Sequence, residues 1–557
     1  MTKGTGPFVI SRGCPLCYRE DMASELTIEF LEIHDNELVV EGRVHTSLPV
    51  KVPKVVFRSV INDIEAAVSE LANAATHAER TFIFEAHLPV GKFRPLLGQV
   101  GLQEFPNVKR GKFCPVTDVP HSYYYADGHA VTLQQNQTLE FAQRGDKWLE
   151  ERERSFQASL IKNNHANQQD IALRQRALQQ RRHSADKAIW LISDRPNLAG
   201  DNGEALFKYL TKNPPANVQV YYVLEADSQD FERLSAIGDV LEYWSDEHKL
   251  ALLQATNNIS SCADEFVINP FEGKRKAFAD LLRANFVFLQ HGITQNDVSH
   301  WLNRWNKNIK LFTTAAEGET RSILDNPLCG YSASIVKRTG FARHDTLLAQ
   351  DAQRKQEGRT PRHVLIAPTW RSWLRGGRRA NSSAYPPFKG FTESEYYRFY
   401  QALINDADIK AAADTQNLTV RFLIHPTLIQ EAQQFTSDFA QVVTTYDYAH
   451  EFLDAAVLMT DYSSVAFDFA LLRKPIIYAQ FDEQTFFGTQ WGRGYFNCRE
   501  QGFGPVCTTL QETKDALLGA IENPTMPTLY QQRVDAFFGE VDSHACERIA
   551  ALIQGIR

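Results

Sequence analysis

The first quarter of the chain alternates apolar and polar residues over short runs. LTIEFLEI, ELVVEGRVH, KVVFRSV and RTFIFEAHL, all between residues 25 and 130, mix this alternation with β-branched and aromatic residues, which predicts β-strands. Residues 61–80 interrupt the pattern with an Ala- and Glu-rich run that predicts a helix. We therefore expect residues 1–136 to form a β-rich accessory domain, a small β-sandwich without a catalytic cluster.

Residues 137–185 predict a helical linker, because they contain no proline and are rich in Gln, Arg, Glu and Ala. The basic residues of this stretch gather late, as Arg174, Arg176, Arg181 and Arg182. Such a cluster can contact an anionic lipid or polymer. We favour the alternative, a solvated helix face that bridges two domains.

From residue 186 onward, continuous apolar strands alternate with helices. KAIWLIS, VQVYYVL, NFVFLQ and KLFTTA come first. After a polar break at residues 351–360, the pattern resumes with HVLIAPT, LTVRFLIHP, VVTTY, AAVLMTD and PIIYAQFD. Apolar strands separated by helices indicate parallel sheets that are buried on both faces. The sequence thus predicts two doubly wound α/β domains, residues 186–350 and 351–557, whose ligands bind at the carboxyl ends of the strands.

Composition narrows the function classes. The chain of 557 residues has a formal net charge of -8, whereas nucleic-acid binders are normally basic, so we expect no nucleic-acid partner. No apolar run reaches the roughly 18 residues of a membrane span, and the start lacks the apolar stretch of a signal peptide. We expect a cytoplasmic protein, at most loosely associated with the inner face of the plasma membrane. Its eight cysteines are scattered, and the CxxC of Cys14 and Cys17 lacks a second pair, so we expect no metal site.

In the first α/β domain, the main candidate follows the strand NFVFLQ. His291 and Gly292 stand where that strand turns toward a helix. A histidine titrates near neutral pH and can take a proton from a hydroxyl, and a glycine lets the backbone approach a phosphate. A lone histidine is more often structural, so the functional interpretation depends on what stands at the other strand ends.

In the second α/β domain, Thr369 and Arg371 follow the strand HVLIAP. Residues 361–392 contain six basic residues and no Asp or Glu. In an acidic protein, such a run suits an electrostatic funnel for an anionic substrate. The alternative is a basic loop without a specific ligand. We favour the funnel, with Arg371, nearest the strand end, as the principal residue.

The remaining strand ends carry further polar groups. His425 follows LTVRFLI, and Asp461, Ser463 and Ser464 follow AAVLMT. Two serines that open a helix offer hydroxyls and free amides to an anion, although N-capping alone would explain one of them.

Asp468, about one turn into the helix after Ser464, and the segment TGFARHD add further candidates. Asp461 and Asp468 can each bind a ribose hydroxyl or orient a histidine, although Asp468 can also simply favour the dipole of its helix. Just before the predicted domain boundary, TGFARHD brings Arg343 and His344 together.

Absent motifs exclude several enzyme classes. There is no GxxxxGK[ST], no HExxH and no GxSxG, which argues against P-loop nucleotidases, zincins and nucleophile-elbow hydrolases. What remains is two α/β domains with His, Arg and Ser at facing strand ends. This set suits the transfer of a phosphate-containing group from a nucleotide donor.

Five segments together resemble the CDP-glycerol glycerophosphotransferase family, which contains teichoic-acid primases and polymerases and related capsule polymerases. They are IWLISDRPNLAGDNGEALFKYL, LQHGITQND, TGFARHD, APTWR and TDYSSVAFDFALLRKPIIYAQFD, and the resemblance covers roughly residues 186–535. The resemblance implies a GT-B fold with the active site in the cleft between its domains. It also implies transfer of a polyol phosphate from a CDP-polyol to a hydroxyl of a polyol-phosphate or glycan acceptor, possibly on a lipid carrier, with release of CMP and without a required cofactor.

The same resemblance implies roles for the candidates. His291 is the expected general base, while His425, Arg371, Ser463 and Ser464 are expected to hold the pyrophosphate. The expected donor-binding residues are Arg371, Thr369, Ser463, Ser464, Asp461, Asp468, Arg343 and His344. The expected acceptor-side residues are Arg195, Asp201, Asn202, Gly203 and Gly292.

The chain departs from the family pattern at two points. Ala342 stands where members commonly have proline, which alters mainly the stiffness of the loop. No basic residue follows His425 and Pro426 directly, and we expect Arg371 or Arg343 to supply that charge.

Three other functions stay open from sequence alone. The donor can be CDP-ribitol instead of CDP-glycerol, because the two polyols differ little in the pocket they need. A nucleotide-sugar glycosyltransferase of the same fold is the next alternative. The last is a non-catalytic polymer-binding module, which the retained histidines, Arg371 and serines argue against.

Overall fold

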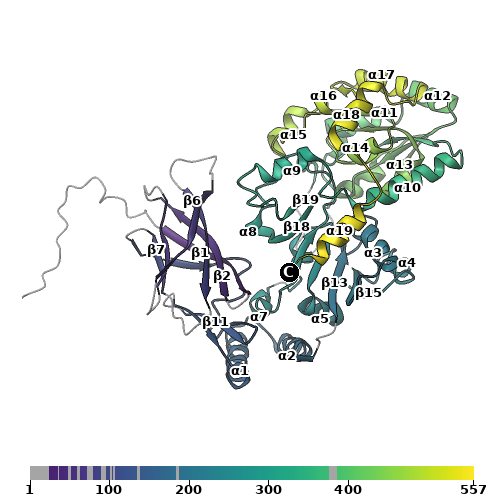
Figure 1. The fold of residues 1–557 in the computed structure, drawn as a ribbon. Helices are drawn as coiled ribbons and strands as arrows, with labels where there is room; N and C mark the ends of the chain where they lie inside the picture. The colour runs from purple at the N-terminus through teal and green to yellow at the C-terminus, as the bar shows by residue number, and fades with distance from the viewer. Residues whose placement is uncertain are drawn as a thin grey trace, which may run out of the picture. The chain divides into compact units, whose positions relative to one another are not determined.

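The computed structural model describes residues 24–34, 37–47, 52–58, 63–71, 80–89, 96–100, 103–104, 107–134, 138–183, 187–271, 273–375 and 386–556. It divides into two compact units, residues 1–171 with 276–280, and residues 172–275 with 281–557 (Figure 1). Among the described residues, no helix has both the length and the apolar character to cross a membrane.

The first unit is built mainly from β-strands. A five-stranded sheet has the order β5-β6-β2-β1-β9 and a four-stranded sheet the order β4-β3-β7-β8. A third, antiparallel sheet contains β10, β11 and β12. Side chains from all three sheets, among them Leu26, Phe57, Phe82 and Phe141, are buried in one apolar core. The strands are β1 (Ser24–His34), β2 (Glu37–Thr46), β3 (Val55–Arg58), β4 (Asp63–Glu65), β5 (Ala67–Leu71), β6 (Arg80–Pro89), β7 (Leu96–Val100), β8 (Gln103–Glu104), β9 (Asn107–Arg110), β10 (Tyr124–Ala126), β11 (His129–Leu133) and β12 (Leu139–Gln143).

The helix predicted over residues 61–80 is wrong where the structure describes this segment. It contains β4 and β5 instead, and residues 72–79 lie outside the described ranges. Ile64 pairs across from Phe57 on β3, and Val68 pairs across from Phe84 on β6. Both side chains pack against the core of the first unit, and this cross-strand packing outweighs the helix propensity of Ala and Glu.

Helices α1 (Asp146–Lys162) and α2 (Gln168–His183) occupy most of the predicted linker. The expected solvated basic face of α2 is wrong at two of its arginines, which pack against the chain. Arg174 is completely buried, and Arg181 donates to the carbonyls of Leu253 and Leu281 at 2.5 and 3.0 Å. Arg176 instead keeps 49% of its side chain exposed in an ion pair with Asp246. The side chain of Arg182 lies outside the described residues.

The second unit contains a seven-stranded parallel sheet with the order β15-β14-β13-β16-β17-β18-β19. The chain runs from β13 outward through β14 to β15, then returns to place β16 on the other side of β13 and continues through β19. The direction of winding therefore reverses between β13 and β16. The strands are β13 (Ala188–Ser193), β14 (Val218–Leu224), β15 (Val240–Glu242), β16 (Asn257–Ser260), β17 (Asn285–Phe288), β18 (Ile309–Thr314) and β19 (Val336–Arg338). The helices of this part are α3 (Asn202–Lys212), α4 (Phe231–Ser235), α5 (Asp246–Gln254), α6 (Glu265–Ile268), α8 (Arg304–Lys307) and α9 (Glu317–Leu324). Most of the short helix α7 (Arg275–Phe278) lies in the segment 276–280 that belongs to the first unit.

A six-stranded parallel sheet follows, with the order β22-β21-β20-β23-β24-β25 and the same reversal between β20 and β23. Ligands of such sheets bind at the carboxyl ends of the strands beside the reversal. The strands are β20 (His363–Ile366), β21 (Thr419–Leu423), β22 (Ala440–Val443), β23 (Ala455–Thr460), β24 (Ile476–Ala479) and β25 (Val506–Cys507). The α-helices are α10 (Ala342–Gln356), α11 (Glu395–Leu403), α12 (Ala407–Thr415), α13 (Tyr448–Asp454), α14 (Val465–Leu471), α15 (Glu483–Thr489), α16 (Cys498–Gln501), α17 (Leu510–Glu522), α18 (Thr528–Phe538) and α19 (Ala545–Gln554), and the short 3-10 segments are Ser372–Leu374, Phe391–Glu393 and Pro426–Gln434.

The chain crosses between the two sheets at two places. α10 leads from the first sheet to the second and includes residues 351–356, so the break predicted there is helical in its first half. α19 returns to the first sheet, where Ile549 and Ile553 are buried beside Trp190 (Figure 1). The two crossings touch, because the carboxylate of Asp345 accepts hydrogen bonds from the amides of Ala545 and Cys546 at 3.0 and 2.8 Å.

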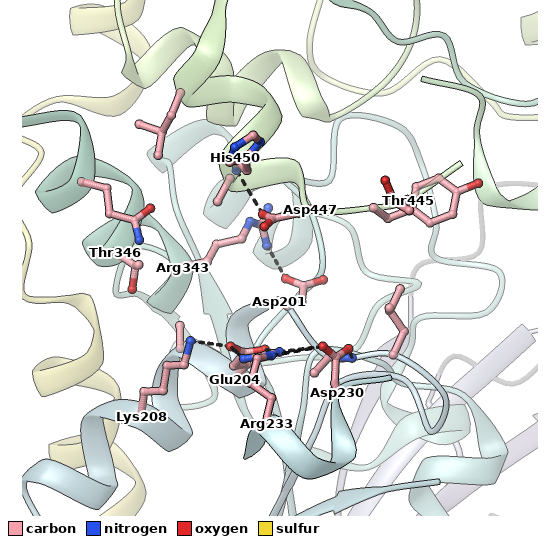
Figure 2. Close-up of a pocket in the computed structure, with 18 of the residues that line it drawn as sticks. Asp201, Glu204, Lys208, Asp230, Arg233, Arg343, Thr346, Thr445, Asp447 and His450 are labelled. Atoms are coloured by element: carbon pink, nitrogen blue, oxygen red, sulfur yellow. Dashed lines mark hydrogen bonds and ion pairs between the residues drawn. The ribbon is translucent and has the colours of Figure 1, made fainter. Parts of the chain in front are cut away.

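A buried ion-pair network at the start of α10 ties the two sheets together. Arg343 contacts Asp201 of α3 at 2.7 Å (Figure 2) and Asp468 of α14 at 2.8 Å. His344 contacts the other oxygen of Asp468 at 2.6 Å. Burial alone would raise the pKa of Asp468, but the charge of Arg343 and the hydrogen bond from His344 outweigh it and hold the pKa at about 2.

We expect Asp468→Asn to lower the free energy of unfolding by about 3 kcal/mol at pH 7, because it leaves Arg343 and His344 without their shared carboxylate. A depressed folded-state pKa stabilises the protein above the unfolded pKa of about 3.9. The difference between wild type and variant should therefore persist above about pH 4 and vanish as the pH falls toward 2. Denaturant titrations at a series of pH values measure the loss of unfolding free energy and its dependence on pH.

The control is Asp535→Asn, which removes an exposed ion pair with Arg473 and should leave the free energy of unfolding unchanged. An Asp468→Asn protein as stable as wild type at pH 7 would show that the network does not hold the sheets together.

Candidate active site

His291 stands in the loop after β17 and is exposed to solvent. The protein around it nevertheless displaces much of its water, and this desolvation lowers the pKa of His291 to about 4. The charges of Arg195 and Arg343 lower it too, while a hydrogen bond to the backbone of Ser261 opposes the shift. The ring is therefore neutral at pH 7, with one nitrogen engaged by the chain and the other left to accept a proton.

The backbone before His291 is held in an uncommon conformation. Gln290 has φ 62 and is buried. Its carbonyl accepts a hydrogen bond of 2.6 Å from the side chain of Asn202, which also donates to Leu289 at 3.1 Å. The side-chain carbonyl of Asn202 accepts from the amide of Arg343 at 3.0 Å. Asn202 thus connects the histidine loop directly to the ion-pair network.

Glu319 secures the other side of the same loop and was not among the sequence candidates. Its carboxylate is buried and accepts from the amides of Thr294 and Ala315 at 2.9 and 2.8 Å. Burial raises the pKa of Glu319 to about 8. Its position in the first turn of a helix after a strand is the one signal in the sequence, and that pattern is equally typical of simple helix capping.

The histidine loop meets the loop after β23. A side chain on Gly292 would place its Cβ 2.5 Å from the hydroxyl oxygen of Ser464 and would force that hydroxyl to move. The amide of the Gln295 side chain donates to the carbonyl of Tyr462 at 2.6 Å. Ser463 and Ser464 are partly exposed at the start of α14. The structure thus brings the HG and DYSS motifs together, as expected for facing strand ends.

His425 follows β21 and is half-buried. Its Nδ1 accepts from the amide of Thr427 at 3.2 Å, so the neutral ring carries its proton on Nε2. Burial lowers the pKa of His425 to about 3, and the charges of Arg195 and Arg371 lower it further. The charge of Arg195 thus acts on both His291 and His425, and we group the two histidines as one candidate reaction centre.

Arg195, placed on the acceptor side from sequence, is the exposed cation of this centre. It follows β13, and within the described residues its guanidinium has no ion-pair or hydrogen-bond partner. A guanidinium that is free and exposed between two neutral histidines is well placed to bind a phosphate.

The prediction that Arg371 contacts the donor is wrong. Arg371 is fully buried and pairs with Asp461 at 2.9 Å and Asp482 at 2.6 Å. The amide of Thr369 donates to Asp461, which is itself completely buried. Both carboxylates neutralise Arg371 inside the protein, so Arg371 and Asp461 hold the loops after β20 and β23 and cannot reach a substrate. Of the basic run, Arg378 and Arg379 lie outside the described residues.

The donor contacts predicted for Asp468 and His344 are wrong for the same reason, since both are buried in the ion-pair network. Arg343 also belongs to that network, but its side chain keeps 19% of its surface exposed. Asp201 caps α3 and pairs with Arg343, and Asn202 is completely buried. These residues join the two sheets and position His291.

The start of α3 is occupied by the chain itself. Asp194, at the end of β13, accepts hydrogen bonds from the amides of Asp201, Gly203 and Glu204 between 2.7 and 3.1 Å. Gly203 permits this approach, because a Cβ there would lie 2.5 Å from the carbonyl oxygen of Ser193. Burial raises the pKa of Asp194 to about 6, and the neighbouring Asp201 raises it further. An internal carboxylate therefore fills the place that a phosphate takes in many doubly wound sheets.

The described residues contain no group of three or more His, Cys, Asp or Glu side chains arranged to hold a metal ion. The cysteines in these ranges are free thiols: Cys114, Cys262, Cys329, Cys498, Cys507 and Cys546. Cys14 and Cys17 lie outside the described residues.

Comparison with known proteins finds relatives along the second unit. The chain is 36% identical over 367 residues to the minor teichoic acid biosynthesis protein GgaB of Bacillus subtilis, a match that covers 65% of this chain and 39% of GgaB. It is 28% identical over 194 residues to a teichoic acid poly(ribitol-phosphate) polymerase of Bacillus spizizenii, covering 33% of this chain and 26% of that protein. The chain therefore spans well under half the length of both curated relatives.

The fold is similar to that of the wall teichoic acid polymerase TagF, with a TM-score of 0.50 and 15% identity over 74% of this chain and 98% of the solved one. Residues 175–555 match the family described as CDP-glycerol:poly(glycerophosphate) glycerophosphotransferase, which is more than half of the chain. The chain belongs to this glycerophosphotransferase family.

Proposed function

We propose that the chain transfers a polyol phosphate, glycerol phosphate first, from a CDP-polyol to a hydroxyl of a teichoic-acid-like polymer and releases CMP. The convergence of two neutral histidines on the free guanidinium of Arg195 carries this proposal. Family membership supplies the donor class. The two doubly wound parallel sheets support the finer assignment of a GT-B fold with an N-terminal accessory domain, in which the second sheet binds the donor and the first faces the acceptor.

In the proposed reaction, the acceptor hydroxyl attacks the β-phosphorus of the donor. His291 takes the hydroxyl proton as the new P–O bond forms. The bond between the β-phosphorus and the bridging oxygen breaks, and CMP leaves with the electron pair. The protonated His291 then returns its proton to water, which its low pKa favours. This displacement needs no redox or organic cofactor.

The remaining groups stabilise charge in this scheme. Arg195 neutralises the phosphate oxygens, and neutral His425 donates a hydrogen bond from Nε2. The hydroxyls and amides at Ser463 and Ser464 donate to the departing CMP. Arg195 replaces Arg371 in the role that the sequence suggested, because only Arg195 is exposed.

CDP-ribitol is the second candidate donor. The specific observation in its favour is the 28% identity to a poly(ribitol-phosphate) polymerase over 194 residues. A donor panel separates the two polyols directly.

We expect acceptor-dependent CMP release from CDP-glycerol or CDP-ribitol, and no release of UDP from UDP-sugars. His291→Ala should lower kcat by about 1,000-fold, because the attacking hydroxyl loses its base. The control His544→Ala removes an exposed histidine of the C-terminal part and should leave the rate unchanged. Turnover of a UDP-sugar alone would replace the proposal with a glycosyltransferase.

The pH dependence provides a second prediction. A base works in its neutral form, and the pKa of His291 is lowered to about 4, so kcat/KM should stay level from pH 7.5 to about 5 and fall by half near pH 4. An unperturbed histidine would give half of the rate near pH 6.5. Circular dichroism at each pH checks that the protein stays folded, and a midpoint near 6.5 would contradict the assigned environment.

Arg195 and Arg371 form a matched pair of variants. Arg195→Gln should lower kcat by about 100-fold with an unchanged Tm, because an exposed charge stabiliser is lost. Arg371→Gln should instead lower the free energy of unfolding by about 3 kcal/mol, because Asp461 and Asp482 lose their buried partner. A stable Arg371→Gln protein with a raised donor KM would restore the sequence-based assignment.

A further inference from the structure

A cavity of about 620 Å³ opens beside the reaction centre. Helices α3, α10 and α13 and the loops after β13 and β22 surround it (Figure 2). Its volume lies within the roughly 300–1,000 Å³ of small-molecule sites. Asp201 and Arg343 form part of its wall, and Asn202, the neighbour of Asp201, donates a hydrogen bond of 2.6 Å to the carbonyl of Gln290, immediately before His291. The cavity is thus next to the hydroxyl-activating base.

The cationic side chains in the wall of this cavity are all ion-paired. Lys208 and Arg233 contact Glu204 at 2.5 and 2.6 Å, and Figure 2 shows this cluster extending to Asp230. The remaining pairs are Arg343 with Asp201, Arg359 with Glu357, and Arg354 with Asp454.

The wall has no excess of positive charge. Its five Lys and Arg side chains are matched by five carboxylates, those of Asp201, Glu204, Asp230, Glu357 and Asp447. A phosphodiester would therefore meet a neutral wall that contains repelling carboxylates, so the cavity does not suit an anionic segment.

The available hydrogen-bonding groups of the wall are uncharged. Gln229, Thr346, Gln350 and Thr445 are exposed, and none of these side chains has a partner in the part of the chain that the structure describes. Amides and hydroxyls both donate and accept, which is the capacity that the hydroxyls of a sugar require. The partly exposed ring of Tyr446 adds an apolar surface to the same wall.

We propose that this cavity binds an uncharged, hydroxyl-rich glycosyl unit of the acceptor. This inference rests on the proposed function and deepens it, because it names a sugar-bearing polymer as the acceptor. The phosphate-containing parts then lie at Arg195, and the glycosyl unit anchors the acceptor chain so that its terminal hydroxyl reaches His291.

Hydrogen–deuterium exchange on the full chain tests this without catalysis. The probes are a panel of neutral trisaccharides built from glucose, galactose and N-acetylglucosamine, a sugar-free oligo(glycerol phosphate), and CDP-glycerol. We expect a trisaccharide to slow exchange in residues 198–208 and 445–453. The double variant Gln229→Leu and Gln350→Leu should weaken this protection by about tenfold or more in apparent affinity, because two hydrogen-bonding partners are lost. The control Gln356→Leu changes an exposed glutamine of the same helix that is outside the cavity wall and should bind as wild type.

The outcomes separate the two proposals. Salt-sensitive protection of the cavity by oligo(glycerol phosphate) would identify a phosphate site and overturn the inference. No protection by any trisaccharide, with CDP-glycerol protecting residues 460–470, would overturn the inference and leave the proposed function standing. Trisaccharide protection without any response to CDP-glycerol would uphold the cavity and count against the proposed donor.

Discussion

The pairing of Arg343 with Asp201 and Asp468 is the interaction on which the candidate site depends. His291 stands at the end of a strand of the first sheet, whereas His425 and the two serines stand at strand ends of the second. Only a fixed relation between the sheets places these groups around one centre. Arg343 supplies it with one guanidinium, because Asp201 stands at the start of α3 beside the first sheet and Asp468 stands in α14 beside the second. Asp468 is buried and Asp201 is partly buried, so the attraction between the charges is strong.

The network also sets the conformation of the catalytic loop. Asn202 accepts from the backbone of Arg343 and donates to the carbonyl of Gln290, immediately before His291. Glu319 holds the same loop from the opposite side. The side chain of His291 can therefore be exposed and still well oriented, because its backbone is fixed by buried polar groups on both flanks.

The parallel strands could be predicted because continuous apolar runs such as VQVYYVL have few alternatives in a doubly wound sheet. β16 could not, because its buried Asn257 and Asn258 lack that pattern. The side-chain amide of Asn258 donates to the carbonyl of Val267, a partner that only the folded chain supplies. The roles of the arginines could not be predicted from the sequence either. Arg371 and Arg195 both follow a strand, and buried pairing with Asp461 and with Asp482, 111 residues away, removes Arg371 from the surface. His291 and His425 could be proposed from the sequence because each directly follows a strand, whereas ion pairing is a property of the tertiary structure.

The contact between the two chain crossings has a mechanical consequence. The start of α10 and the start of α19 both pass from one sheet to the other, and Asp345 holds them together. Two connections that are joined to each other resist twisting and sliding of one sheet past the other more than a single connection would. The loops that carry His291 and the two serines therefore keep their alignment.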